Sequence, residues 1–206
     1  MAHKWNDKVK GTGRLLVYAD PTVQKGIWGS LIEASIGEFN QLSKQHKFGV
    51  TLQKSDDPPI PGGGGADVLV ATANGQIDFK YDGIEEKLPF DGTRMHGKTR
   101  QIRRDDGMEK AYVYLPAQPM ISTPNGRRAV GPAIMKLILV HEFVHACGLV
   151  DAEHSTEDLF QGNPNVDYGQ NAARDRAMGK RGKQTVWMPP LFLSAETARR
   201  IKDNWA

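Results

Sequence analysis

The 206-residue sequence contains a single cysteine, and this scarcity of thiols limits the kinds of site that the chain can form. One cysteine excludes a disulfide within the chain, and it excludes a zinc site built from several thiolates. A low thiol content also fits a reducing compartment. A metal ion bound by this chain would therefore take histidine and carboxylate ligands, and the sequence supplies six histidines and 24 acidic residues.

Long apolar runs and a strong net charge are also missing. No uninterrupted apolar segment approaches the ~20 residues that a helix needs to cross a bilayer, so we expect no membrane partner. The N-terminal residues have neither the apolar core nor the cleavage site of a secretory signal, which favours a cytoplasmic protein. The formal charge of +3 is small and spread along the chain, and it argues against nucleic acid as the main partner.

Strand and helix signals alternate in the first part of the chain, whose length suits a single domain over 1–206. Apolar residues at three- and four-residue spacing predict a helix over about 23–44. Proline and glycine predict a loop over 56–65. Short apolar segments rich in strand-forming residues predict strands over 14–19, 48–53, 66–73 and 110–115.

The polar, glycine-spotted segment 76–109 predicts a surface loop with a hairpin near Asp105-Asp106-Gly107. This segment carries a basic cluster without interleaved aromatic residues. We interpret the cluster as a solvated face rather than a phosphate site. Its members are Lys98, Arg100, Arg103 and Arg104.

The most apolar helix signal lies over 129–147. Pro132 falls in its first turn, where the missing N–H costs no hydrogen bond, and Gly148 stands where a C-terminal glycine is common. The chain then predicts loop until residues 194–205, which predict a final amphipathic helix with Ser194 as its N-cap.

One motif in the apolar helix points to metal chemistry, namely His141-Glu142-Phe143-Val144-His145. Four residues advance a helix by about 400°, so the two imidazoles are about 40° apart on one face and ~6 Å apart along it. Two neutral nitrogens at that spacing can bind one zinc ion, the cofactor we predict. Glu142 points about 100° away, and from there it can take a proton from a zinc-bound water as general base.

A catalytic zinc site has three protein ligands and an open position for water, so a third ligand is needed. The segment after Gly148 offers Asp151, Glu153 and His154. Because imidazole suits zinc better, we favour His154, with Asp151 as the alternative and Glu153 as a weaker choice. Cys147 is predicted to face the core as a small apolar residue. The remaining histidines have no ligand-like neighbours and are predicted at the surface: His3, His46 and His96.

This pattern resembles the metzincin-type zinc metallopeptidases, and in particular a small bacterial or phage-like member. The resemblance rests on His-Glu-x-x-His-x-x-Gly followed by Asp151 at the usual third-ligand position, and it covers about residues 12–205. It implies an α+β fold: a twisted mixed sheet with a long helix and an active-site helix over 12–148, and a smaller C-terminal lobe over 149–206. It also implies a methionine turn, for which Met188 is favoured over Met178.

The resemblance further implies a zinc-dependent endopeptidase whose substrate is a protein or peptide in extended conformation. An edge strand near 111–115 would pair with that substrate. The alternative is a non-catalytic binding module that keeps the fold and the zinc. An intact Glu142 counts against this alternative, because a purely structural site needs no general base.

Overall fold

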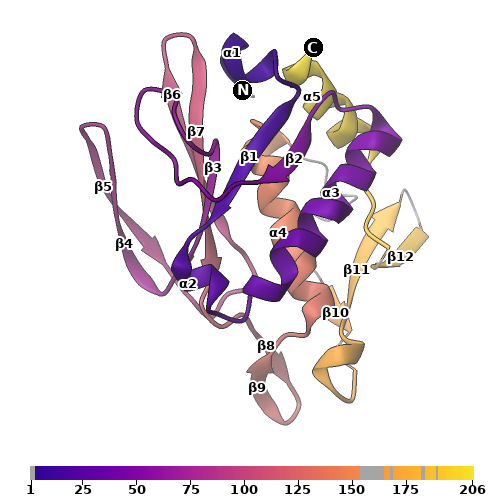
Figure 1. The fold of residues 1–206 in the computed structure, drawn as a ribbon. Coiled ribbons are helices and arrows are strands. Elements are labelled where there is room, and N and C mark those ends of the chain that lie inside the picture. Colours follow the sequence, from indigo (N-terminus) through magenta and orange to yellow (C-terminus); the bar gives the residue numbers. More distant parts are fainter. Residues whose placement is uncertain (1–2, 154–164, 168, 182–183, 189) are drawn as a thin grey trace.

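The computed structural model describes residues 3–153, 165–167, 169–181, 184–188 and 190–206. They form an α+β fold around one mixed sheet of five strands (Figure 1). Four strands are parallel, and the last runs antiparallel to its neighbour. In spatial order the strands are β2 (Thr51–Lys54), β1 (Arg14–Ala19), β3 (Val68–Ala73), β7 (Gly107–Pro116) and β6 (Lys98–Arg104). The predicted α+β class with a mixed sheet is therefore confirmed.

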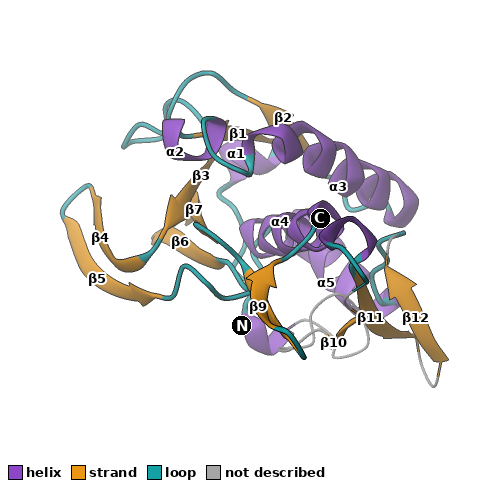
Figure 2. Cartoon of the chain, turned by 90° about the horizontal axis from the view of Figure 1, so that it is seen from below, coloured by secondary structure: helices purple, strands orange, loops and turns teal. Residues whose placement is uncertain are grey.

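Two long helices, α3 (Ile32–His46) and α4 (Pro132–Ala146), cover one face of this sheet (Figure 2). Residues in a strand point alternately to the two faces, and in β1 the residues facing the helices are buried. The helices meet through Phe39 and Phe143, whose rings lie edge to face at 6.4 Å. The main hydrophobic core lies between this sheet face and the two helices, which places α4 beside the sheet along most of its length.

The opposite face of the sheet is covered by a hairpin of β4 (Gly75–Tyr81) and β5 (Ile84–Phe90). Ile77, Phe79 and Tyr81 alternate along β4 and pack with Ile102 of β6 in a second apolar cluster. The prediction of a surface loop over 76–109 was therefore wrong, because apolar residues at every second position build a strand there. The hairpin predicted near residue 105 is confirmed, since β6 turns into β7 at that point.

The helix predicted over about 23–44 begins later than expected, at Ile32. It is preceded by a single turn, α2 (Pro21–Gln24), and by a 3-10 turn at Gly29–Leu31. The break falls at Gly26 and Gly29, where the backbone folds so closely that a Cβ would collide with the carbonyl oxygens of the preceding turn. The apolar periodicity continues through this break, so periodicity alone does not locate it.

The remaining described elements are short, and several lie in the C-terminal part that was expected to be loop. There, β10 (Asn165–Asp167), β11 (Arg176–Arg181) and β12 (Gln184–Met188) form an antiparallel sheet, which corrects that expectation. The final helix α5 (Ala195–Trp205) is confirmed, and Ser194 Oγ accepts the Thr197 N–H as its N-cap. The other elements are α1 (Asp7–Lys10), β8 (Met120–Thr123), β9 (Gly126–Ala129) and the 3-10 turns Asp151–Glu153 and Ala172–Arg174.

The segment 111–115 does not lie at the edge of the sheet, where the resemblance implied that it would. The segment 110–115 is a strand, but it lies inside β7, which pairs with β3 on one side and with β6 on the other. Its backbone groups are therefore already used within the sheet, and β6 is the edge strand.

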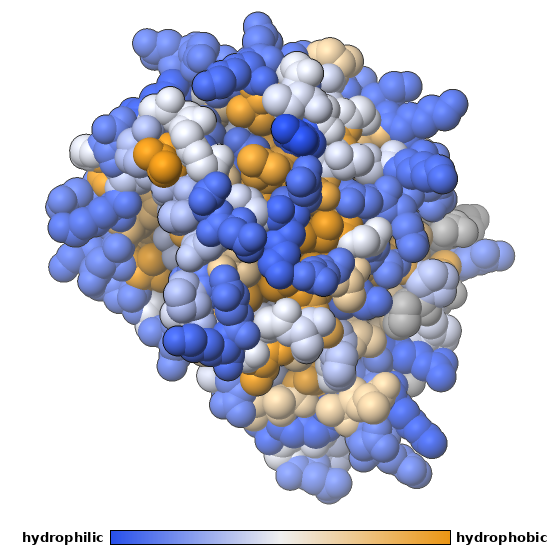
Figure 3. All heavy atoms as spheres, viewed as in Figure 1, coloured by the Kyte–Doolittle hydropathy of each residue, from blue (hydrophilic) through white to orange (hydrophobic). Residues whose placement is uncertain are grey.

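The described helices also bear on the expectation about membranes. None of them is both long and apolar enough to span a bilayer. On the face shown in Figure 3, hydrophilic side chains predominate, and apolar side chains are visible mainly in recesses between them.

Candidate metal centre

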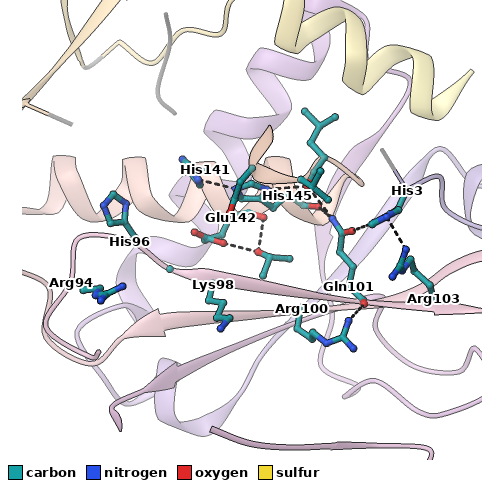
Figure 4. A pocket seen from close by; sticks show the side chains of 15 residues that line it. His3, Arg94, His96, Lys98, Arg100, Gln101, Arg103, His141, Glu142 and His145 are labelled. Atoms are coloured by element: carbon teal, nitrogen blue, oxygen red, sulfur yellow. Dashed lines mark hydrogen bonds and ion pairs between the residues drawn. The ribbon is translucent and has the colours of Figure 1, made fainter. Parts of the chain in front are cut away.

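The two histidines of the motif lie on one face of α4, as their spacing predicts. Their Nε2 atoms are 3.0 Å apart, and their ring centroids are 4.8 Å apart (Figure 4). Two nitrogens that each lie about 2.0–2.1 Å from one zinc ion can be at most about 4.2 Å apart, so the observed pair fits a shared ion.

The ring of His145 is held in the form that a metal ligand needs. Its Nδ1 atom lies 3.0 Å from the carbonyl oxygen of Leu149. Because a carbonyl oxygen only accepts hydrogen bonds, Nδ1 carries a proton, and in the neutral ring this leaves the lone pair on Nε2, the nitrogen that faces His141. A backbone carbonyl behind a ligating histidine is the usual way to fix this tautomer and ring orientation.

Of the candidates for a third ligand, the structure describes Asp151 and Glu153. Asp151 Oδ1 lies 3.4 Å from His145 Nε2, while the favoured His154 lies outside the described residues. Glu153 Oε2 accepts the Val150 N–H at 3.4 Å within the same turn. In the part of the chain that the structure describes, no three His, Cys, Asp or Glu side chains gather closely enough to hold a metal ion. The choice between His154 and Asp151 therefore stays a prediction.

Glu142 is buried beside this pair, with 2% of its surface exposed. Its Oε2 accepts a hydrogen bond from the Thr99 hydroxyl at 2.7 Å, and the Gly97 N–H donates a further one. Burial raises the pKa of the Glu142 carboxyl, while nearby His145 and the two hydrogen bonds act in the opposite direction. A Cβ at Gly97 would lie 2.6–2.8 Å from the Glu142 side chain, so only glycine allows this close approach.

The edge strand β6 supports the motif through alternate residues that sequence reasoning missed. Thr99 holds Glu142, and two positions later Gln101 Nε2 donates to the carbonyl oxygens of His145 at 2.7 Å and Leu149 at 3.1 Å. The Leu149 oxygen is also the one that His145 Nδ1 contacts, so Gln101 fixes the group that orients the His145 ring. The signal in the sequence was a period-two pattern of polar residues within 76–109, and it was hidden by the glycines and charges around it.

The carbonyl groups at the C-terminal end of α4 accept hydrogen bonds from residues that are distant in the sequence. The Trp5 indole N–H donates to Ala146 O at 2.8 Å, and the Trp205 indole N–H donates to Cys147 O at 3.3 Å. The last carbonyls of a helix have no partner within the helix, so these bonds satisfy groups that would otherwise be costly to bury. Both ends of the chain thereby fix the part of α4 that carries the motif.

The N-terminal segment completes this support through His3. Its backbone N–H donates to Gly148 O at 2.8 Å, and its ring nitrogens lie 2.6 Å from Gln101 Oε1 and 2.9 Å from Arg103 Nη1. Gly148 itself has φ +103°, the conformation expected of a glycine after a helix end. His3 and His96 are partly exposed, in keeping with the prediction that they lie at the surface, and both also line the pocket at the motif.

That pocket has a volume of about 750 Å³ and runs along β6 beside the C-terminal half of α4. His141, Glu142 and His145 of α4 line one side of it, and side chains of β6 and of the segment just before it line the other (Figure 4). Asp151 is also among its lining residues. The pocket is large enough for a stretch of peptide, and its chemistry is concentrated where Glu142 meets the histidine pair.

Two further residues singled out in the sequence, Met188 and Cys147, are buried in the core. Met188 is the last residue of β12 and is buried in the main core, while Pro189, which would continue its turn, lies outside the described residues. Cys147 is fully buried, as predicted, and burial raises the pKa of its thiol, so it is an inert core residue.

The chemistry of the two imidazole nitrogens suits a zinc ion: they face each other, and one ring is oriented by a carbonyl, while the described residues do not complete a three-ligand group. No protein-family model and no curated protein sequence matches the chain. The resemblance to metzincin-type peptidases therefore stays a prediction that rests on the motif.

Proposed function

We propose that this chain is a zinc-dependent endopeptidase. One observation carries the proposal: the Nε2 atoms of His141 and His145 face each other at 3.0 Å, next to the buried carboxylate of Glu142, inside a pocket bounded by an edge strand. A site with only a structural metal has no need for a buried, hydrogen-bonded carboxylate beside it.

The residues have distinct roles in this proposal. His141 and His145 hold the zinc ion, together with His154 or, as the alternative, Asp151. When bound, zinc lowers the pKa of a water ligand and polarises a carbonyl oxygen. Glu142 accepts the proton of the attacking water and returns it to the leaving amine, a contribution of about 10²–10⁴ in rate for a positioned acid–base group. Thr99 and Gly97 hold the carboxylate in place for both transfers.

The substrate strand would lie along β6 rather than along 111–115. An extended peptide can bind by adding a strand to an open sheet edge, where backbone N–H and C=O groups still lack partners. The outer edge of β6 pairs with no other strand among the described residues, and it borders the pocket. Side chains of the bound peptide would then alternate between the two faces of the sheet.

Metal analysis and peptide digestion together test the proposal. We expect about one zinc per chain in the wild-type protein, loss of zinc in His145→Ala, and retained zinc without hydrolysis in Glu142→Gln. His46→Gln serves as the control, since His46 stacks on Phe48 away from the pocket. A wild-type protein without zinc, or full peptidase activity in Glu142→Gln, would overturn the proposal. Zinc without hydrolysis of any peptide in the wild type would favour the non-catalytic binding module.

The third ligand has its own test. Zinc content is compared between His154→Ala and Asp151→Ala, and we expect loss of zinc in the first and retention in the second. The reverse result would assign the third position to Asp151.

A further inference from the structure

The pocket carries a surplus of positive charge. Four of its lining residues are lysine or arginine, while the carboxylates among its described lining residues are Glu142 and Asp151, both at the motif itself. The cations stand on β6 or just before it: Arg94, Lys98, Arg100 and Arg103.

These cations differ in how far their charge is already neutralised. Arg100 forms two hydrogen bonds to Glu86 at 2.6 and 2.9 Å, and its guanidinium lies 5.9 Å from the Phe79 ring centroid. Arg94 lies 3.7 Å from Asp91 at the surface. Within the described residues, Lys98 and Arg103 form no ion pair with a carboxylate, and Arg103 instead contacts His3. Lys98 and Arg103 are therefore the charges most available to a ligand.

Their positions along β6 place them on either side of the motif. Thr99 and Gln101, which contact Glu142 and the His145 carbonyl, lie between them. Five residues of strand span about 17 Å, so Lys98 and Arg103 flank the reacting centre at the two ends of that length. Figure 4 shows Lys98 extending to the side of β6 away from Glu142, and Arg103 turned towards His3. Residues five positions apart in a strand point to opposite faces of the sheet, which accounts for this difference in direction.

We propose that this site selects acidic peptides, with a carboxylate side chain on each side of the scissile bond, one near Lys98 and one near Arg103. The inference deepens the proposed function and rests on it. Opposite charges on adjacent strands attract each other, and the pocket walls reduce screening by solvent. Each charge pair is expected to change KM by about two- to fivefold.

The test uses pairs of fluorescent peptides that differ only in Glu or Gln at the flanking positions of a mapped cleavage site. We expect the Glu peptide to have the lower KM with the wild-type protein, with similar kcat. The preference should fall in Lys98→Gln, persist in Lys98→Arg, and be unchanged in the control Lys25→Gln, whose lysine lies away from the pocket lining. Raising the salt concentration should reduce it. Equal KM values for the two peptides in the wild type would overturn the inference.

Binding separates this inference from the proposed function. Fluorescence anisotropy of the same peptides, or of a second pair chosen without a cleavage map, is measured with Glu142→Gln and with Glu142→Gln/Lys98→Gln. Tighter binding of the Glu peptide that depends on Lys98 supports the inference even if no peptide is hydrolysed. Equal binding of the Glu peptide by the two variants overturns the inference. A competition experiment gives a second such outcome: a single-stranded oligonucleotide that displaces the Glu peptide at a lower concentration than an acidic peptide does.

Discussion

A buried carboxylate lies near each end of helix α4, and the two carboxylates have different hydrogen-bond and ion-pair partners. At the N-terminal end, Asp175 accepts the Gly131 N–H at 2.8 Å and forms a two-bond ion pair with Arg128 at 2.5 and 2.9 Å. At the C-terminal end, Glu142 is held by the Thr99 hydroxyl and the Gly97 N–H, and among the described residues no lysine or arginine pairs with it.

This difference fits a structural role for Asp175 and the reactive role that we propose for Glu142. Asp175 is bound to a cation and a helix N–H, and the backbone is so close there that a Cβ at Gly131 would collide with Ala172 O. Glu142 lines a pocket, and burial without a paired cation raises its pKa. A carboxylate in the second setting can exchange a proton with a ligand, whereas one in the first setting is committed to holding the fold.

The largest expected effect is on catalysis at the C-terminal end. Glu142→Gln should lower kcat about 10²–10⁴-fold, because an amide cannot accept the proton of the attacking water. The amide oxygen can still accept from the Gly97 N–H while the amide N–H donates to the Thr99 hydroxyl, so the free energy of unfolding should change by no more than about 1 kcal/mol. Peptide hydrolysis and urea denaturation measure the two quantities. A variant that loses stability in step with activity would show that Glu142 is structural, like Asp175.

The next effect is on stability at the N-terminal end. Asp175→Ala should lower the free energy of unfolding by about 3–5 kcal/mol, because it leaves Arg128 and the Gly131 N–H partly buried without their partner. Asp203→Ala is the control, since its ion pair with Arg199 is solvent-exposed and should matter by about 0.5 kcal/mol. Urea denaturation measures both. A small loss in Asp175→Ala would remove the contrast between the two ends.

A smaller effect is expected where β6 supports His145, which we propose as a zinc ligand. Gln101→Ala should weaken zinc binding about 10–100-fold, because the Leu149 carbonyl that orients His145 loses its second partner. Gln53→Ala, at an exposed position on the far edge strand, should leave zinc affinity unchanged. Competition with a chelator measures the affinity. Unchanged affinity in Gln101→Ala would mean that the helix alone positions His145.

The smallest effect concerns Gly97, the glycine beside the proposed general base Glu142. Gly97→Ala should lower kcat severalfold while zinc content stays constant, because the added methyl group pushes the Glu142 side chain from its place. Gly37→Ala is the matched control: Gly37 lies within α3 with open space around it, and alanine there should stabilise the fold by about 0.5–1 kcal/mol. Equal kcat in wild type and Gly97→Ala would show that Glu142 tolerates displacement.

Local patterns predicted the elements whose residues interact over short distances. The strand β1, the helix α4 with Pro132 and Gly148 at its ends, and α5 with its Ser194 cap follow from periodicity and capping residues. The start of α3 was missed because a backbone break at two glycines does not interrupt the apolar pattern. Strands β4 to β6 were missed because their apolar residues are diluted by the charges that a half-exposed hairpin requires.

The sequence by itself determined that His141 and His145 share a helix face, because four residues make about one helical turn whatever surrounds the helix. It also determined that Cys147 belongs to the core. Only the tertiary structure decided which strand borders the motif, which groups fix Glu142 and His145, and that Trp5, His3 and Trp205 meet the end of α4. Those contacts join residues as many as 145 positions apart, as between His3 and Gly148, and no local pattern encodes a pairing over that distance. The same reason applies to the basic residues of β6, which the sequence alone indicated as a solvated face. Their place beside the pocket arises from the order of strands in the sheet.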